Sequence, residues 1–180
     1  WLDSVPDKDF EESDYFRHYM GLLNSERLNQ ILEKYDLEVN FYLHAKFQEY
    51  ADTFKSISKR IHLISFGEVA VNEMLMRCRM LITDYSSVCW DILYQDKPSL
   101  FYQFDIEKYN EAHGSYIDME TELFGDRAAT QEQLLDYLEE TVQNDFHLKP
   151  EYEKMRGEYL QFKDHEHSRH ICEEIKKRFH

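Results

Sequence analysis

Two adjacent serines in the stretch LITDYSS, residues 81–87, are the first residues to which a chemistry can be assigned. The apolar residues 80–83 predict a buried strand, and the pattern of residues 86–95 predicts a helix directly after it. The first turn of a helix presents unpaired N–H groups and the positive end of the helix dipole, so a phosphate bound there gains several donors. The hydroxyls of Ser86 and Ser87 would add further donors, although one serine could equally be a simple helix cap.

This turn contains no glycine, and its acidic residue calls for a separate explanation. Asp84 would repel a bound phosphate. We therefore expect its carboxylate to accept hydrogen bonds from loop N–H groups or from a ribose, or to stiffen the turn in place of glycine.

Polar residues also follow the other predicted strands, and in open parallel sheets ligands bind beyond the carboxyl ends of the strands. A histidine in that position can donate to a phosphate or act as an acid or base near neutral pH, or it can simply be half-buried and bonded to a carbonyl. The residues at the four strand ends are His44, then Phe66 and Gly67, then Thr83, Asp84, Tyr85, Ser86 and Ser87, and finally Gln103 and Asp105.

The elements that would position these residues alternate along residues 21–104. Helical spacing is found in 21–35, 45–55, 68–78 and 86–95, and strand patterns in 39–44, 60–65, 80–83 and 98–104. This order predicts an α/β fold: a Rossmann-like, doubly wound parallel sheet with helices on both faces.

The flanking segments lack this alternation. We expect one domain over residues 1–180, with an irregular lead-in at about 1–20, a long loop at 105–126 and a helical C-terminal extension at 150–180. Thr130 and Gln133 form a capping box that predicts a helix over 131–143, and two further helices are predicted over 151–162 and 168–179.

Composition excludes several classes of function. The formal net charge of −15 argues against binding to nucleic acid or to an anionic membrane. The three cysteines contain no C-x-x-C pair and indicate neither a zinc site nor a disulfide framework, so we expect a reducing compartment. His165, His167 and His170 could bind a metal, but we favour a solvated polar turn and expect no metal site. The chain begins at Trp1, and we expect it to be part of a longer protein. No stretch of these 180 residues has the apolar length of a membrane span.

Roughly residues 38–145, which include His44, resemble the CDP-glycerol glycerophosphotransferase family, the teichoic acid primases and polymerases and related capsule-polymer synthases. The matching residues are Leu81 to Ser87, Trp90 and Asp91, Lys97 and Pro98, Phe101 and Tyr102, Asp105 and Tyr109, and Gly114, Tyr116 and Asp118.

This resemblance implies that the chain is the donor-binding, C-terminal half of a GT-B fold. The implied reaction moves glycerol phosphate from CDP-glycerol to a growing polymer and releases CMP, with no cofactor and no metal. Ser86 and Ser87 would hold the donor diphosphate, and His44 would contact the transferred glycerophosphate. The resemblance also implies that an absent N-terminal domain supplies a base histidine, binds the polymer or lipid-linked acceptor and contacts the inner face of the cytoplasmic membrane. The isolated domain is then expected to be inactive.

Two other functions stay open. His44 is followed by Ala45 where the family has proline, and such differences leave room for a non-catalytic nucleotide-binding or scaffold domain. A GT-B glycosyltransferase that uses a nucleotide sugar is the other alternative, and CDP-ribitol or another CDP-alditol is an alternative donor.

Overall fold

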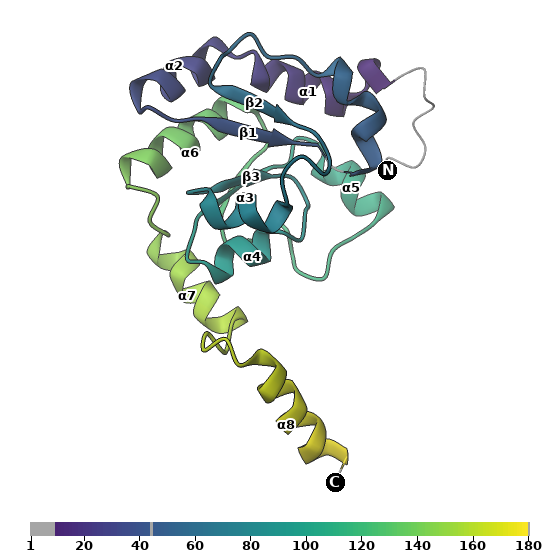
Figure 1. The fold of residues 1–180 in the computed structure, drawn as a ribbon, viewed down its shortest axis with the longest axis vertical. Coiled ribbons are helices and arrows are strands. Elements are labelled where there is room, and N and C mark those ends of the chain that lie inside the picture. The colour runs from purple at the N-terminus through teal and green to yellow at the C-terminus, as the bar shows by residue number, and fades with distance from the viewer. Residues whose placement is uncertain (1–9, 44, 180) are drawn as a thin grey trace.

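The structure is a computed structural model that describes residues 10–43 and 45–179 (Figure 1). Its strands are short and all pair in parallel, as the alternating pattern predicts. They are β1 (Val39–Tyr42), β2 (Ile61–Ile64), β3 (Leu81–Thr83), β4 (Ser99–Tyr102) and β5 (Asp126–Ala128). In the described residues, β1 pairs with β2, and a second sheet has the order β3-β4-β5.

Helices cover both faces of these strands, so the predicted α/β class is confirmed. Figure 1 shows α1 and α2 above the strands and α3 and α4 below them. The α-helices are α1 (Asp14–Leu23), α2 (Glu26–Lys34), α3 (Val71–Arg77), α4 (Cys89–Tyr94), α5 (Ile106–Ala112), α6 (Gln131–Gln143), α7 (Pro150–Tyr159) and α8 (His167–Phe179), and the 3₁₀ helices are η1 (Phe10–Glu12) and η2 (Ala45–Thr53).

The described strands form two hydrogen-bonded sheets rather than one continuous sheet, but a common core joins them. Tyr19 of α1 contacts Phe41 of β1 with ring centroids 5.7 Å apart and Tyr102 of β4 at 5.9 Å. All four residues of β4 are buried, which is typical of a central parallel strand covered on both faces. The residues that follow β4 are therefore positioned by a fully buried strand.

The expectation of an irregular lead-in over residues 1–20 is wrong for its described part. Helix α1 begins at Asp14, because the hydroxyl of Ser13 accepts a hydrogen bond from the N–H of Phe16 at 3.1 Å. Tyr15 and Tyr19 are buried one turn apart, so the aromatic residues that look irregular in the sequence are the apolar face of a helix.

Other differences concern element boundaries. The helix predicted over 21–35 is interrupted before Ser25, which caps α2 by accepting from the N–H of Leu28. The segment 105–126, predicted to be a loop, contains α5 and the first residue of β5.

The C-terminal helices lie close to their predicted positions. Thr130 caps α6 as expected, while the side chain of Gln133 accepts from the N–H of Ala129 instead of returning to Thr130. Helix α7 packs against the body, where the ring of Tyr159 contacts those of Trp90 and Phe124, whereas α8 extends away as an arm and has no buried residue (Figure 1). Within the described residues, no helix is both long enough and apolar enough to span a membrane.

Candidate functional site

The turn after β3 is held by hydrogen bonds to side chains. The Asp84 carboxylate accepts from the N–H of Tyr85 at 2.6 Å, and the Asp84 carbonyl accepts from the Gln103 side-chain amide at 3.1 Å. Residues 83–88 all have negative φ angles, so the turn needs no glycine. Asp84 thus accepts a hydrogen bond from a loop N–H group, which is one of the roles expected for it.

Tyr85 connects this turn to the end of β4. Its hydroxyl donates to Asp105 Oδ1 at 2.8 Å, and its ring stacks on that of Tyr109 with a centroid distance of 3.6 Å and an interplanar angle of 3°. Burial raises the pKa of Asp105; the hydrogen bond from Tyr85 opposes this rise and the nearby charge of Asp84 adds to it. Burial likewise raises the pKa of Tyr85, so the phenol keeps its proton and remains a donor.

Two buried acceptor atoms lie beside this turn. Among the described residues, Gln103 Oε1 and Asp105 Oδ2 have no hydrogen-bond partner, although both residues are buried. A buried polar atom without a partner is costly, and such atoms call for a specific explanation. Both atoms are acceptors, so their chemistry suits a ligand hydroxyl or amine.

The start of α4 offers hydrogen-bond donors. The N–H groups of Cys89 and Trp90 bond to the carbonyls of Ser86 and Ser87 at 3.3 and 3.1 Å. The N–H groups of Ser86, Ser87 and Val88 have no acceptor in the part of the chain that the structure describes. Val88 is the capping residue of α4 and there is no side-chain cap, so neither serine serves as the simple cap that the sequence left open. Three N–H groups and two hydroxyls together can bind the oxygens of a phosphate.

The structure therefore unites most, but not all, of the expected site residues. Thr83, Asp84, Tyr85, Ser86 and Ser87 form the turn, and Gln103 and Asp105 contact it. Phe66 and Gly67 follow β2 in the other sheet, with Phe66 62% exposed and Gly67 at φ 84°, outside this hydrogen-bonded cluster of described residues. His44 lies outside the described residues.

The family model of CDP-glycerol:poly(glycerophosphate) glycerophosphotransferases matches residues 7–177. The chain belongs to this family. Its members are transferases, and the likeness seen in residues 38–145 extends over almost the whole chain.

Named relatives and one solved structure agree with this assignment. The chain is 26% identical over 157 residues to "Minor teichoic acid biosynthesis protein GgaB" of Bacillus subtilis, covering 86% of this chain and 17% of that protein. It is 27% identical over 146 residues to "Teichoic acid glycerol-phosphate transferase" of Staphylococcus aureus, covering 78% of this chain and 34% of that protein. The structure resembles "Structure of the Wall Teichoic Acid Polymerase TagF" with a TM-score of 0.63 and 21% identity over 88% of this chain and 39% of that one, which shows a shared fold. The chain thus spans about a third or less of the length of these two relatives.

Within this glycerophosphotransferase domain, helix α1 contributes residues that the sequence did not single out. Burial raises the pKa values of Tyr15 and Tyr19, and the charge of Asp84 adds to both. His18 stacks on Phe104 at a centroid distance of 3.9 Å, and its Nδ1 lies 3.0 Å from the hydroxyl of Tyr102. The four-residue spacing of the two tyrosines was the signal available in the sequence.

The C-terminal histidines do not converge on one point. Nδ1 of His165 and Nε2 of His167 lie 3.3 and 3.0 Å from the Tyr94 hydroxyl, whereas His170 pairs with Asp164 at 2.7 Å. In the described residues no three His, Cys, Asp or Glu side chains form a group that could hold a metal ion.

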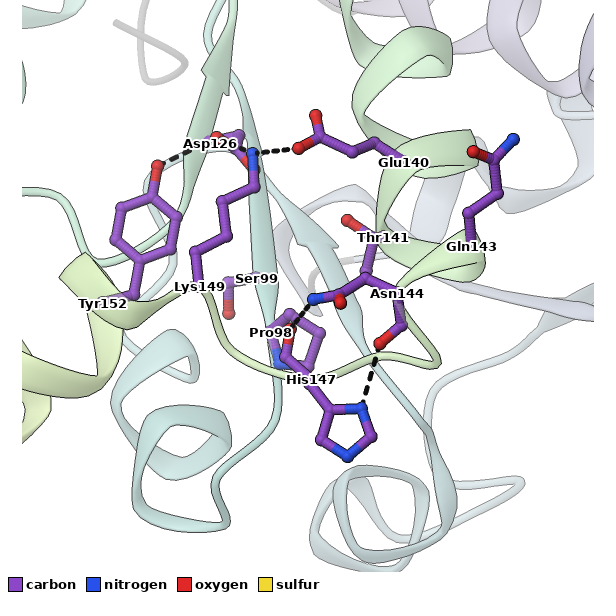
Figure 2. Close-up of a pocket in the computed structure, with 10 residues that line it drawn as sticks. All are labelled: Pro98, Ser99, Asp126, Glu140, Thr141, Gln143, Asn144, His147, Lys149 and Tyr152. Carbon is purple, nitrogen blue, oxygen red and sulfur yellow. Dashed lines mark hydrogen bonds and ion pairs between the residues drawn. The ribbon is translucent and has the colours of Figure 1, made fainter.

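A cavity of about 400 Å³ lies elsewhere in the domain (Figure 2). Ser99 and Asp126 line it, and these residues open β4 and β5, so the cavity is at the amino ends of the strands. Lys149 crosses it between Asp126 and Glu140, with N–O distances of 2.9 and 3.0 Å. The cavity therefore lies at the opposite ends of these strands from Gln103 and Asp105, and its cation is already paired with two carboxylates.

Proposed function

We propose that this chain is the donor-binding domain of a transferase that moves polyol phosphate from CDP-glycerol, or another CDP-alditol, to a teichoic-acid-like or capsule polymer. The observation that carries the proposal is the family match over residues 7–177. The unpaired N–H groups and hydroxyls at the start of α4 support it, because they lie in the LITDYSS stretch, which is part of the family resemblance.

The geometry supports a division of labour at the donor. The diphosphate would bind the N–H groups and hydroxyls of residues 86–88, where α4 begins. The buried acceptors of Gln103 and Asp105 would face hydroxyl or amine groups of the donor. His44 would contact the transferred glycerophosphate, as the family resemblance implies, and would stabilise its charge. Phe66 and Gly67 would approach the donor from the other sheet.

The chemical step is an in-line displacement at the β-phosphorus of the donor. An acceptor hydroxyl forms the new P–O bond while the bond to the CMP oxygen breaks, and the hydroxyl proton passes to a general base. CMP is the leaving group, and the N–H donors at the start of α4 stabilise the negative charge that develops on its phosphate. The base and the acceptor site belong to the N-terminal half of a GT-B enzyme in this proposal, and no metal or cofactor takes part.

The proposal also assigns a cellular setting. The complete enzyme would work in the cytoplasm, at the inner face of the membrane, and the acceptor would be a polymer or a lipid-linked chain held by the N-terminal half. Nucleic acid is not a partner in this proposal, and the formal charge of −15 supports that view.

Calorimetric titration of the chain with CDP-glycerol, CMP, UDP-glucose and ADP tests the donor. We expect selectivity for the cytidine compounds. Substituting both Ser86→Ala and Ser87→Ala should weaken CDP-glycerol binding about 10- to 100-fold, since hydrogen bonds to charged groups are worth about 1.5–3 kcal/mol. Ser168→Ala, at an exposed serine of α8, is the matched control and should bind like the parent.

Each remaining outcome identifies one alternative. Unchanged binding by the double variant would reject this placement of the diphosphate. A preference for UDP or ADP compounds would indicate a nucleotide-sugar glycosyltransferase, and absence of binding to all four would indicate a scaffold domain. In a longer protein that includes the upstream half, His44→Ala should reduce turnover more than CDP binding, and an equal loss of both would reject its catalytic role.

A further inference from the structure

Helix α5 lies against the donor-binding turn without belonging to the core. None of its seven residues, Ile106–Ala112, is buried. Its described links to other elements are polar or aromatic: Lys108 Nζ pairs with Asp14 Oδ2 at 2.6 Å, and Tyr109 stacks on Tyr85. A helix held in this way contributes little to the core, so its placement beside the turn calls for another reason.

The side chain at the start of α5 is directed toward the turn. Asp105 is the capping residue of α5, a position where an aspartate normally accepts from an N–H of the first helical turn. No such capping bond is found in the described structure, and the carboxylate accepts from the hydroxyl of Tyr85 through Oδ1. The helix thus gives up a local stabilising contact, and the turn gains one.

Tyr85 is fixed from both sides by this arrangement. Asp105 holds the hydroxyl, and Tyr109 covers the ring at 3.6 Å in a nearly parallel stack. His113, one helical turn further along, continues the stack on Tyr109 at 5.4 Å and 14°. Because the N–H of Tyr85 also bonds to Asp84, a fixed ring orients the backbone that leads to the free N–H groups of residues 86–88.

We propose that Tyr109 is a positioning residue of the donor site, which acts through Tyr85 to hold the Asp84–Ser87 turn in its phosphate-binding shape. The identity of the ligand in this inference rests on the proposed function, whereas the effect of Tyr109 on the turn does not. It assigns the positioning effect to the ring of Tyr109 rather than to its hydroxyl. Phenylalanine should therefore replace tyrosine at this position, whereas alanine should not.

The first experiment needs no ligand. Amide hydrogen exchange, resolved by NMR, reports the bonds made by the N–H groups of Tyr85, Cys89 and Trp90, all of which depend on the shape of the turn. Tyr109→Ala should speed exchange at these amides about two- to tenfold, in keeping with the usual strength of an aromatic pair. Tyr109→Phe should exchange like the parent. The matched control is Phe162→Ala, which removes a similar surface stack, on His170 at 3.9 Å, from the C-terminal arm.

The second experiment titrates the same variants with CDP-glycerol. Tyr109→Ala should raise the dissociation constant about two- to tenfold with an unchanged midpoint of global unfolding, and Tyr109→Phe should restore the parent value. Unchanged exchange at the three amides in Tyr109→Ala would overturn the positioning role, whatever the donor does. If the turn loosens but the parent chain does not bind CDP-glycerol, the proposed function and the donor part of this inference fail together, while the control of the turn by Tyr109 stands.

Discussion

Gly125 lies directly before β5 and is the position where a single methyl group should do most harm. A Cβ built on Gly125 would overlap the carbonyl oxygen of Ser99 and lie 2.9 Å from Cε2 of Phe101. Both neighbours belong to β4, the central buried strand of its sheet. The φ angle of Gly125 is not in the left-handed region, so the cost of Gly125→Ala comes from these contacts alone.

The magnitude follows from what would have to move. A clash with the end of a flexible side chain relaxes cheaply, whereas a carbonyl in a strand moves only together with the strand. Overpacking of a core typically costs about 1–3 kcal/mol, and a backbone clash belongs at or above the upper end of that range. In a domain of this size, a loss of about 3 kcal/mol lowers the melting temperature by about 6–12 °C.

Urea unfolding followed by circular dichroism measures this loss. The ring of Trp90 lies 4.5 Å from that of Phe124, next to the altered residue, so its fluorescence would report the same site. The control is Gly157→Ala in α7, where a Cβ meets no atom within 4 Å. This control should gain about 0.5–1 kcal/mol, because glycine is unfavourable inside a helix. A Gly125→Ala variant within about 0.5 kcal/mol of the parent would refute the tight approach of the segment before β5 to β4, because ordinary surface substitutions fall in that range.

Two predictions concern ionisable groups. Burial raises the pKa of Asp105, so the contribution of this carboxyl to stability is present at low pH and is lost as the pH rises through the raised pKa. Asp105→Asn should therefore raise the free energy of unfolding above that of the parent at pH 7.5. Near pH 4 the variant should lose this advantage. Equal destabilisation at both values, in urea titrations, would contradict the buried carboxylate. Hydrogen bonds from Lys108 and then Arg17 lower the pKa of Asp14 to about 2, and Lys108→Met should move it back toward 3.8 in an NMR titration of the carboxyl carbon, with Arg17 keeping part of the shift. An unchanged pKa would show that α5 is not tied to α1 by this pair.

The sequence predicted the alternating core well because its signals are local. The apolar strand runs and the capping pair Thr130–Gln133 depend on neighbours within a few residues, and the structure confirms four strands and α6 near their expected places. The segment 105–126 was predicted to be a loop because α5 has no buried residue and so leaves no apolar stripe. Strand β5 has only three residues, one of them fully buried, and its pairing with β4 is not visible in local periodicity.

The sequence predicted which residues form the candidate site better than it predicted the contacts between them. The rule that ligands bind beyond the carboxyl ends of strands selected Gln103 and Asp105 along with the serines. It could not show that Gln103 holds the Asp84 carbonyl, because that contact joins residues 19 positions apart. It also could not select Tyr109, whose role depends on which face of a short helix meets the turn.

The side chains that hold the turn explain why it needs no glycine. They also explain why substitutions that affect donor binding should differ from those that affect global unfolding. Its shape comes from the Asp84 carboxylate, the Gln103 amide and the phenol of Tyr85, each of which replaces a constraint that a special backbone angle would otherwise supply. The main core cluster is built mostly from apolar side chains of α1, α2, α6 and the strands. Substitutions at Tyr109 should therefore alter donor binding with little change in global unfolding, whereas Gly125→Ala should do the reverse. A site held by polar side chains on a rigid sheet can change its ligand through a few residues while the fold stays the same.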